Sequence, residues 1–370
     1  MAPGPNAEPA PTAPPNAESA AIEEVSEAEV PEPEAPEPEA PEPDAPVAAL
    51  WRGNLIESVH RGRYVVCNAR GETLDSLGDC RAPVHLRSTA KPFQALPLVF
   101  SGTADEFGIT GEELAVACAS HSGEPRHLAA VRSILRKAGL SEDDLQSGAH
   151  PPMHAPSAAR LLRSGEGPRP IHGNCSGKHA GMLAVCAHAG WDPAGYRDPQ
   201  SPLQKLVRRT LAKLCALRPE DVWLGGDSCG VPVFALPLEN LALGLARLAA
   251  GGVAGGAEDF PEDLVEAIQR VRDAMLAHPY MVAGTGRFDT RLMEETGLIS
   301  KSGAEAVFVA ANPKASWGLA LKISDGASRA VAPAAVTAIK KRGVPVPVWM
   351  GAGEITDLHG KVVGKTAPLL

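Results

Sequence analysis

Ser88 and Lys91 place a hydroxyl and an amine three positions apart in the sequence Ser-Thr-Ala-Lys. If this segment opens a helix, the two side chains meet on one face, because positions three apart are neighbours on a helix. A serine hydroxyl is a weak nucleophile, but an amine whose pKa is lowered by burial or by a second cation can take its proton during attack. The same residues also fit a helix N-cap followed by a solvated lysine. The motif alone leaves both interpretations open.

Two more segments follow in the order typical of serine acyl-transfer enzymes, a serine-bearing loop and a Lys-[Ser/Thr]-Gly segment before a strand. Residues 120–123 (Ser-His-Ser-Gly) supply the loop and residues 301–303 (Lys-Ser-Gly) the second segment. We expect two Ser/Lys pairs at one carbonyl, in which Ser88 attacks and Lys91 is its base. Ser120 and Lys301 then relay a proton to the leaving amine. Two ammonium groups in one partly buried pocket lower each other's pKa, which favours a neutral base near pH ~7.

Two Gly-rich segments bring together side chains that can bind a metal ion. The first contains Cys175, Lys178 and His179, and the second contains Cys229. Residue chemistry favours a zinc site made of the two thiolates and His179, with a fourth position for water. Both cysteines also fit the interpretation of small buried apolar residues. A nucleophilic Cys175 is a third alternative, which the Ser/Lys residues make redundant.

Two charged residues stand next to these motifs. Arg87 precedes Ser88, and a guanidinium there can hold a substrate carboxylate with two parallel hydrogen bonds. Asp227 lies in the second cysteine segment, where a carboxylate can pair with a substrate ammonium. Each residue also fits the interpretation of an ordinary surface charge.

Taken together, five segments resemble the rhizobial-type, or class 3, L-asparaginases. They are residues 87–94 (RSTAKPFQ), 120–125 (SHSGEP), 173–183 (GNCSGKHAGML), 227–238 (DSCGVPVFALPL) and 301–308 (KSGAEAVF). The resemblance extends from about Leu50 to the C-terminus. One departure is Ala306, where the family pattern leads us to expect glycine.

The resemblance implies a function and a set of site residues. Its expected reaction is hydrolysis of L-asparagine to aspartate and ammonia, in a homodimer with a fold similar to that of serine β-lactamases and penicillin-binding proteins. The implied catalytic pairs are Ser88 with Lys91 and Ser120 with Lys301. The implied zinc ligands are Cys175, Lys178 and Cys229 with water. Lys178 thus takes the place that residue chemistry gave to His179. A lysine must lose its proton to bind the metal. The implied substrate contacts are Arg87, His121, Gly123, His179 and Asp227, of which His179 lies beside the metal ligands or on the substrate.

Hydrophobic periodicity predicts the elements that carry these residues. Strand patterns cover 50–59 and 64–68, joined by a turn at 61–63, and 306–310 and 317–323 near the other end. Amphipathic helices are expected over 125–138, 202–216, 234–250 and 262–278. We therefore expect a mixed α/β (α+β) fold, in which the N- and C-terminal strands form one antiparallel sheet covered by helices.

The first 46 residues differ in composition from the rest. They hold twelve of the 44 acidic residues and none of the 35 Lys and Arg, so the net charge of −9 becomes +3 beyond residue 46. We expect a disordered acidic tail over 1–46 and a catalytic domain over 47–370, since such a segment buries too little apolar surface to fold. The sequence lacks a secretory signal and a run of 18 apolar residues, and its seven scattered cysteines are not a disulfide framework.

These features predict a cytoplasmic protein bound to no membrane and no nucleic acid, since its Lys and Arg form no basic stripe. Two alternative functions remain open. One is a related amidase, such as a glutaminase or a β-lactamase-like hydrolase. The other is a non-enzymatic, metal-dependent binding module whose acidic tail recruits a basic partner.

Overall fold

The computed structural model describes residues 44–252, 260–351 and 353–370. The predicted tail therefore lies outside the described residues, except for its last three positions. The first strand already begins at Ala45, two residues before the expected domain boundary.

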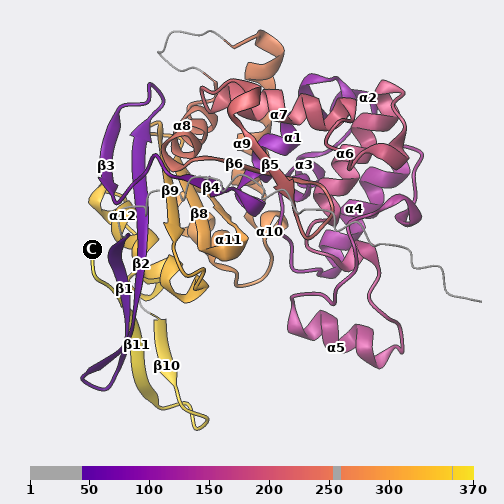
Figure 1. The fold of residues 1–370 in the computed structure, drawn as a ribbon. Helices are drawn as coiled ribbons and strands as arrows, with labels where there is room; N and C mark the ends of the chain where they lie inside the picture. Colours follow the sequence, from indigo (N-terminus) through magenta and orange to yellow (C-terminus); the bar gives the residue numbers. More distant parts are fainter. Residues whose placement is uncertain (1–43, 253–259, 352) are drawn as a thin grey trace, which may run out of the picture. The chain divides into compact units, whose positions relative to one another are not determined.

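An eight-stranded antiparallel sheet runs through the described chain (Figure 1). Its strand order is β10-β11-β1-β2-β9-β8-β7, and β3 pairs with β2. The strands are β1 (Ala45–Arg52), β2 (Leu55–Asn68), β3 (Thr73–Leu77), β7 (Ile299–Ser302), β8 (Val307–Asn312), β9 (Trp317–Ile323), β10 (Gly353–Thr356) and β11 (Val362–Pro368). Strands from both chain ends thus share one sheet, as predicted.

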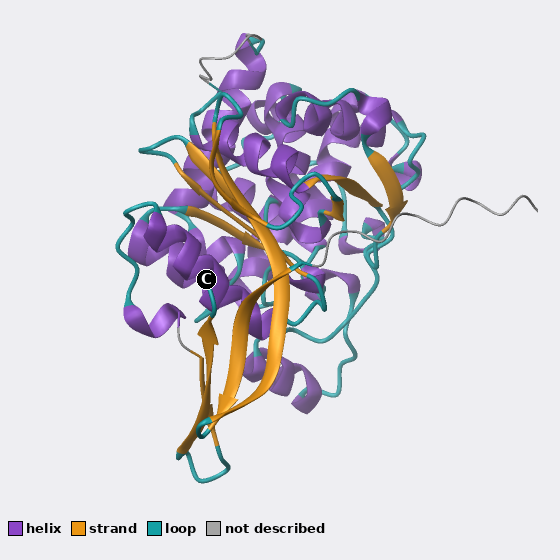
Figure 2. Cartoon of the chain, turned by 60° about the vertical axis from the view of Figure 1, so that its left-hand side comes forward, coloured by secondary structure: helices purple, strands orange, loops and turns teal. Residues whose placement is uncertain are grey.

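Helices cover both faces of this sheet (Figure 2). The helices are α1 (Lys91–Phe100), α2 (Thr103–Glu106), α3 (Gly111–Ala117), α4 (Pro125–Lys137), α5 (Ala155–Arg163), α6 (Ser176–Ala189), α7 (Pro202–Leu214), α8 (Leu238–Ala249), α9 (Glu262–Ala277), α10 (Pro279–Val282), α11 (Phe288–Thr296), α12 (Val331–Lys341) and α13 (Val348–Gly351). Val65 and Cys67 of β2 pack into the core that contains α1 and α8, while the alternating Tyr64 and Val66 pack into the core that contains α12. Because both faces are covered, the central strands are continuously apolar rather than alternating. The predicted fold class is confirmed.

A smaller antiparallel sheet lies among the helices, with the order β4-β6-β5. Its strands are β4 (Pro83–His85), β5 (Trp223–Gly226) and β6 (Pro232–Pro237). It corrects the helix expected over 234–250, because Phe234 belongs to β6 and α8 begins at Leu238. Pro237 at the N-cap of α8 separates the two elements.

The expected turn at 61–63 is also wrong. Strand β2 passes through these residues, and the chain reverses at Gly53 and Asn54 instead. Gly62 pairs with Ala45 on one side and Ile323 on the other. A Cβ at Gly62 would collide with the carbonyl oxygen of Lys322, so this glycine permits a close approach of strands rather than a turn.

Helix α1 is the most enclosed element near the serine motif. Every residue from Lys91 to Val99 is buried, and the helix packs against α6, α7 and α9. A lysine at the first position of such a helix is held away from water.

Among the described residues, none of the helices is both long and apolar enough to cross a bilayer.

Candidate functional site

Ser88 lies in a short 3-10 turn, Arg87–Ala90, that leads directly into α1. This arrangement matches the helix opening expected for the Ser-x-x-Lys motif. Arg87 has a φ of 48°, in the left-handed region. For a residue other than glycine this costs roughly 1–3 kcal/mol, and such strain clusters at active sites. Ser88 is half-buried and lines a cavity of about 420 Å³.

The cavity also receives Ser120, so the structure brings the two predicted serines to one space. Its lining is drawn from separate parts of the chain: Ser88, Ser120, Met153, Asn174, Arg287, Phe288, Ser302, Gly303, Ala304, Ala306, Val307, Ser328, Val331 and Ala332. Ala306 has a φ of 52°, which agrees with the expectation that glycine would suit this position.

Lys91 does not pair as the sequence led us to expect. Its Nζ donates to Ser120 Oγ at 2.9 Å and to the carbonyl oxygen of Ala119 at 2.7 Å. No hydrogen bond among the described residues joins it to Ser88. Burial lowers the pKa of Lys91, and the nearby Lys178 lowers it further against the opposing effect of Cys175. The first lysine is thus linked to the second serine.

Lys301 lies in β7 and is fully buried. Its Nζ donates to the carbonyl oxygen of Ser302 at 2.8 Å and lies 3.9 Å from Oδ2 of Asp289. Burial lowers the pKa of Lys301 to about 7; Asp289 acts against this shift, while Lys91 adds to it. Such a side chain can exchange a proton near neutral pH.

Asp289 is a residue that the sequence reasoning missed. It lies in the first turn of α11 and is 2% exposed. Its carboxylate accepts hydrogen bonds from Ser300 Oγ at 2.8 Å, from the backbone N–H of Ser302 at 2.9 Å and from Ser302 Oγ at 2.9 Å. It therefore holds the strand that carries Lys301. A single aspartate in a helical pattern gave no signal, because its partners lie on another element.

His121 and Gly123 come from the predicted loop but are not among the residues that line the cavity. The backbone N–H of Gly123 donates to His121 Nδ1 at 3.2 Å, so Nε2 carries the proton and donates to Ser176 Oγ at 2.9 Å. Burial lowers the pKa of His121 well below its usual value. This neutral imidazole ties the loop to the start of α6. Contact of His121 and Gly123 with substrate therefore stays a prediction.

The three side chains of the expected zinc set lie together. Lys178 Nζ donates to Cys229 Sγ at 3.1 Å, and a hydrogen bond from Cys229 lowers the pKa of Cys175 well below its ordinary value. The Cys175 thiol is in turn within 3.0 Å of Oδ1 of Asn174, which lines the cavity. The two sulfurs can ligate Zn²⁺ as thiolates, and the Lys178 nitrogen can join them only once it has lost the proton that it donates here.

His179 does not complete a metal site with these cysteines. Among residues 44–252, 260–351 and 353–370, no three His, Cys, Asp or Glu side chains are arranged to hold a metal ion. Instead, His179 Nδ1 lies 2.6 Å from the hydroxyl of Tyr196. Our residue-based choice of His179 as a ligand therefore stays a prediction, which this arrangement does not support.

The other described cysteines behave as buried apolar residues. Burial raises the pKa of Cys67, Cys118 and Cys215 to about 12, so these thiols stay protonated. All seven cysteines are free.

Arg87 and Asp227 contact each other, whereas the sequence had assigned each to a different substrate group. Arg87 Nη2 lies 3.1 Å from Asp227 Oδ1. Neither residue is among those that line the cavity. The ion pair joins the turn before α1 to the loop after β5.

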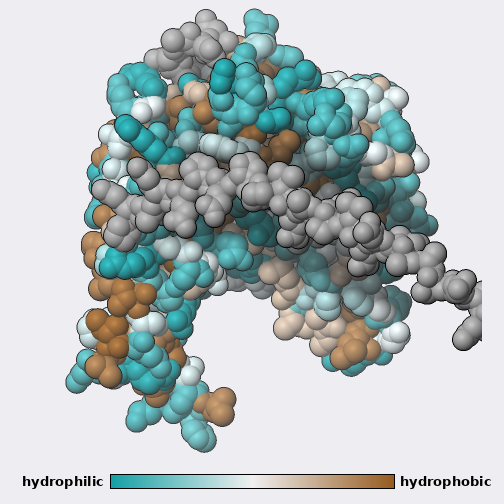
Figure 3. Space-filling view, in the orientation of Figure 1, coloured by the Kyte–Doolittle hydropathy of each residue, from teal (hydrophilic) through white to brown (hydrophobic). Residues whose placement is uncertain are grey.

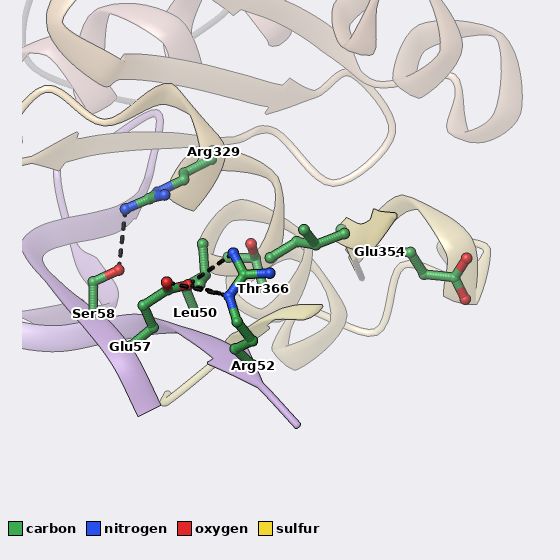
Figure 4. A pocket seen from close by; sticks show the side chains of 9 residues that line it. Leu50, Arg52, Glu57, Ser58, Arg329, Glu354 and Thr366 are labelled. Carbon is green, nitrogen blue, oxygen red and sulfur yellow. Dashed lines mark hydrogen bonds and ion pairs between the residues drawn. The ribbon is translucent and has the colours of Figure 1, made fainter. Parts of the chain in front are cut away.

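A second hollow, of about 640 Å³, lies on the outer strands (Figure 4). It is lined by Leu50, Arg52, Glu57, Ser58, Arg329, Gly353, Glu354, Ile355 and Thr366. Arg52 pairs with Glu57 at 3.2 Å, and Arg329 donates to Ser58 Oγ at 3.0 Å. None of the predicted catalytic or metal-binding residues lines it. The cavity at Ser88 is therefore the better candidate site.

Comparison with known proteins agrees with this choice. A family profile described as L-asparaginase II matches residues 48–367. The chain belongs to the L-asparaginase II family. The resemblance found in the sequence is thereby confirmed, and L-asparaginase II membership supports a general amide-hydrolase activity.

Solved structures add little to the L-asparaginase II assignment. The solved structure described as "Crystal Structure Analysis of Mglu" is 16% identical in sequence and has a TM-score of 0.35. The match covers 76% of this chain and 67% of the other chain. The structure described as "Crystal Structure Analysis of Mglu in its tris and glutamate form" is 13% identical and has a TM-score of 0.37. That match covers 81% of this chain and 63% of the other chain. This chain thus spans about two thirds of their length. Likeness at this level carries no argument about site or substrate. A search of curated proteins finds no significant match.

Proposed function

We propose that this protein hydrolyses L-asparagine to L-aspartate and ammonia through an acyl-enzyme on Ser88. The observation that carries the proposal is the shared cavity, which Ser88 and Ser120 both line while the buried Lys91 donates to Ser120. Membership of the L-asparaginase II family supports asparagine as the amide.

In the proposed mechanism, Ser88 Oγ attacks the carboxamide carbon and releases its proton to Lys91. The 2.9 Å hydrogen bond from Lys91 to Ser120 offers a route for that proton toward the leaving group. The proton then reaches the departing nitrogen, which leaves as ammonia. In the second half water attacks the acyl carbon, the bond to Ser88 Oγ breaks, a proton from that water returns to Ser88 Oγ by the same route, and aspartate is released. Lys301 supports the relay as a group whose pKa of about 7 permits exchange.

Zinc belongs to this proposal as the ion that Cys175, Lys178 and Cys229 would hold. A bound Zn²⁺ supplies a positive charge that can orient or polarise substrate groups. If it acts on the chemical step, chelation lowers kcat; if it shapes the pocket, chelation raises KM. Metal content measured on the purified protein provides a readout independent of activity.

The test is an ammonia-release assay with asparagine and glutamine, with and without chelator. We expect turnover of asparagine, and a preference over glutamine of roughly 1–3 kcal/mol for the extra methylene. A higher kcat/KM for glutamine would favour the alternative of a glutaminase. Ser88→Ala should remove turnover while its circular dichroism spectrum stays native. Substantial turnover by that variant would exclude Ser88 as the nucleophile.

A further inference from the structure

Arg287 is a charged side chain that the sequence reasoning and the proposed mechanism leave unused. It lines the same cavity as Ser88 and Ser120. Among the described residues that line this cavity, Arg287 alone carries a formal charge. A substrate entering the cavity therefore meets one fixed cation.

The guanidinium of Arg287 makes only weak contacts. Its Nη1 lies 3.4 Å from Ser122 Oγ and 3.7 Å from the Met153 sulfur, both longer than a good hydrogen bond. Both acceptors are neutral, and no described carboxylate forms an ion pair with it. Arg87, in contrast, is already bound to Asp227 at 3.1 Å. Arg287 thus retains donors suited to the two-point binding of a carboxylate.

The backbone that carries Arg287 is held firmly against the serine loop. Glu124 accepts hydrogen bonds from Thr285 N at 2.8 Å and Thr285 Oγ1 at 2.6 Å. Thr290 Oγ1 donates to the carbonyl oxygen of Gly284 at 2.8 Å, and the N–H of Arg287 donates to the same carbonyl oxygen at 3.3 Å. The start of the side chain is therefore fixed before substrate arrives, which reduces the entropy lost on binding.

We propose that Arg287 binds the α-carboxylate of the amino-acid substrate and so selects amino acids over simple primary amides. This inference rests on the proposed function, because it concerns the substrate of the same cavity. An arginine that pairs with a substrate carboxylate acts on affinity and orientation, while the amide chemistry stays with the serines. Arg287 is thus a specificity residue.

The test compares two substrates in the wild type and in Arg287→Gln. One is L-asparagine, and the other is 3-aminopropanamide, which is asparagine without its α-carboxylate. Arg287→Gln should lower kcat/KM for asparagine by about 100-fold, mostly through KM, because it removes the guanidinium that pairs with the substrate carboxylate. The value for 3-aminopropanamide should stay unchanged. Arg287→Lys should fall between, since an ammonium keeps the charge but not the two-point geometry.

Two matched controls sharpen this comparison. Arg291→Gln removes an exposed arginine one turn further along α11, whose guanidinium stacks on Trp349 at 3.5 Å, and should leave both substrates unaffected. Arg87→Gln tests the rival assignment from the sequence. If Arg287→Gln weakens both substrates equally, or if Arg87→Gln alone abolishes the preference for the carboxylate, the proposal is wrong.

A binding measurement separates this inference from the proposed function. L-Asparagine is titrated calorimetrically into Ser88→Ala and into Ser88→Ala/Arg287→Gln. We expect the affinity to fall by about 10-fold or more in the double variant. Equal affinities would overturn the role of Arg287 even if the wild type releases ammonia. An inactive wild type that still binds asparagine through Arg287 would instead refute only the proposed reaction.

Discussion

At the scale of single residues, Lys301 makes a clear prediction about pH. Burial lowers its pKa to about 7 against the opposing charge of Asp289 at 3.9 Å, while Lys91 and Arg287 lower it further and Cys175 raises it. If the free enzyme needs a neutral Lys301, kcat/KM rises as the pH increases through about 7. Removing the negative charge of Asp289 lowers the pKa of Lys301 further. The rise of kcat/KM on the acidic side of the pH profile, its acidic limb, therefore moves to lower pH.

Asp289→Asn tests the effect. We expect the acidic limb of kcat/KM to shift down by roughly 1 pH unit, as removal of a close opposite charge predicts. Glu294→Gln is the matched control, because Glu294 is an exposed acid on the same helix. Profiles measured between pH ~5 and ~9 decide the matter. A limb that stays in place in Asp289→Asn would show that Lys301 does not control it.

At the scale of elements, the loop before α11 depends on Gly284. This glycine has a φ of 121°, and a Cβ there would lie 2.5 Å from Glu124 Oε1 and 2.7 Å from Ser122 Oγ. Gly284→Ala therefore combines backbone strain with a steric clash against the serine loop. We expect it to lower the free energy of unfolding by about 2–4 kcal/mol and to raise KM, because Arg287 follows on the same loop.

Gly286→Ala separates these two effects. Gly286 has a φ of 69°, but a Cβ there meets no atom within 4 Å. It should lose only the strain contribution of about 1–2 kcal/mol. Urea unfolding and steady-state kinetics on both variants measure the difference. Equal destabilisation of the two variants would contradict the packing role of Gly284.

The same elements show what the sequence could and could not predict. Helices α4, α7 and α9 and the pair β8 and β9 were predicted nearly in place, because their periodicity is local. Gly62 misled the prediction, since a glycine that admits a neighbouring strand has the same sequence signal as a turn. Motif spacing identified Ser88 and Ser120 as companions. It could not assign the hydrogen bond from Lys91 to Ser120, which spans 29 positions.

Asp289 and Arg287 show a second limit of the sequence. Each is an ordinary charged residue at the start of a short helix, and only the folded chain places Asp289 against β7 and Arg287 in the cavity. Gly284 and Gly286, just before them, are the one local sign of a functional loop. Contacts made between distant elements have no periodicity from which they can be predicted.

At the scale of the whole molecule, the resemblance predicts a homodimer. Large apolar side chains are exposed near the turns of β1–β2 and β10–β11, where Leu55 is 75%, Leu358 103% and Val362 50% exposed. Figure 3 shows apolar surface gathered along these strand ends. Exposed apolar patches mark association sites. Light scattering should give a dimer mass for the wild type and a monomer mass for Leu55→Glu/Val362→Glu. A monomeric wild type, or a double variant that stays dimeric, would refute this interface.

The acidic N-terminal segment is expected to be dispensable for catalysis, because the residues that line the cavity lie between 88 and 332. Residues 1–43 hold eleven acidic residues and no Lys or Arg, so a chain that starts at Asp44 has a net charge of +2 in place of −9. We expect this truncated chain to keep the kcat/KM and the melting temperature of the full chain. A large loss of activity would mean that the segment contributes to the site.

The stability of the truncated chain should depend on whether truncation removes the two or three residues after position 43. Asp44 is half-buried, pairs with Arg63 at 3.2 Å and accepts a hydrogen bond from Ser324, while Ala45 pairs with Gly62. A chain that starts at Val47, the boundary expected from composition, loses these contacts and leaves a largely buried guanidinium without its carboxylate. Its free energy of unfolding should fall by about 1–3 kcal/mol relative to the chain that starts at Asp44. Urea unfolding of the two truncations measures this difference directly. Equal stabilities would place the true edge of the domain at residue 47, because Asp44 would then contribute nothing to the sheet that it adjoins.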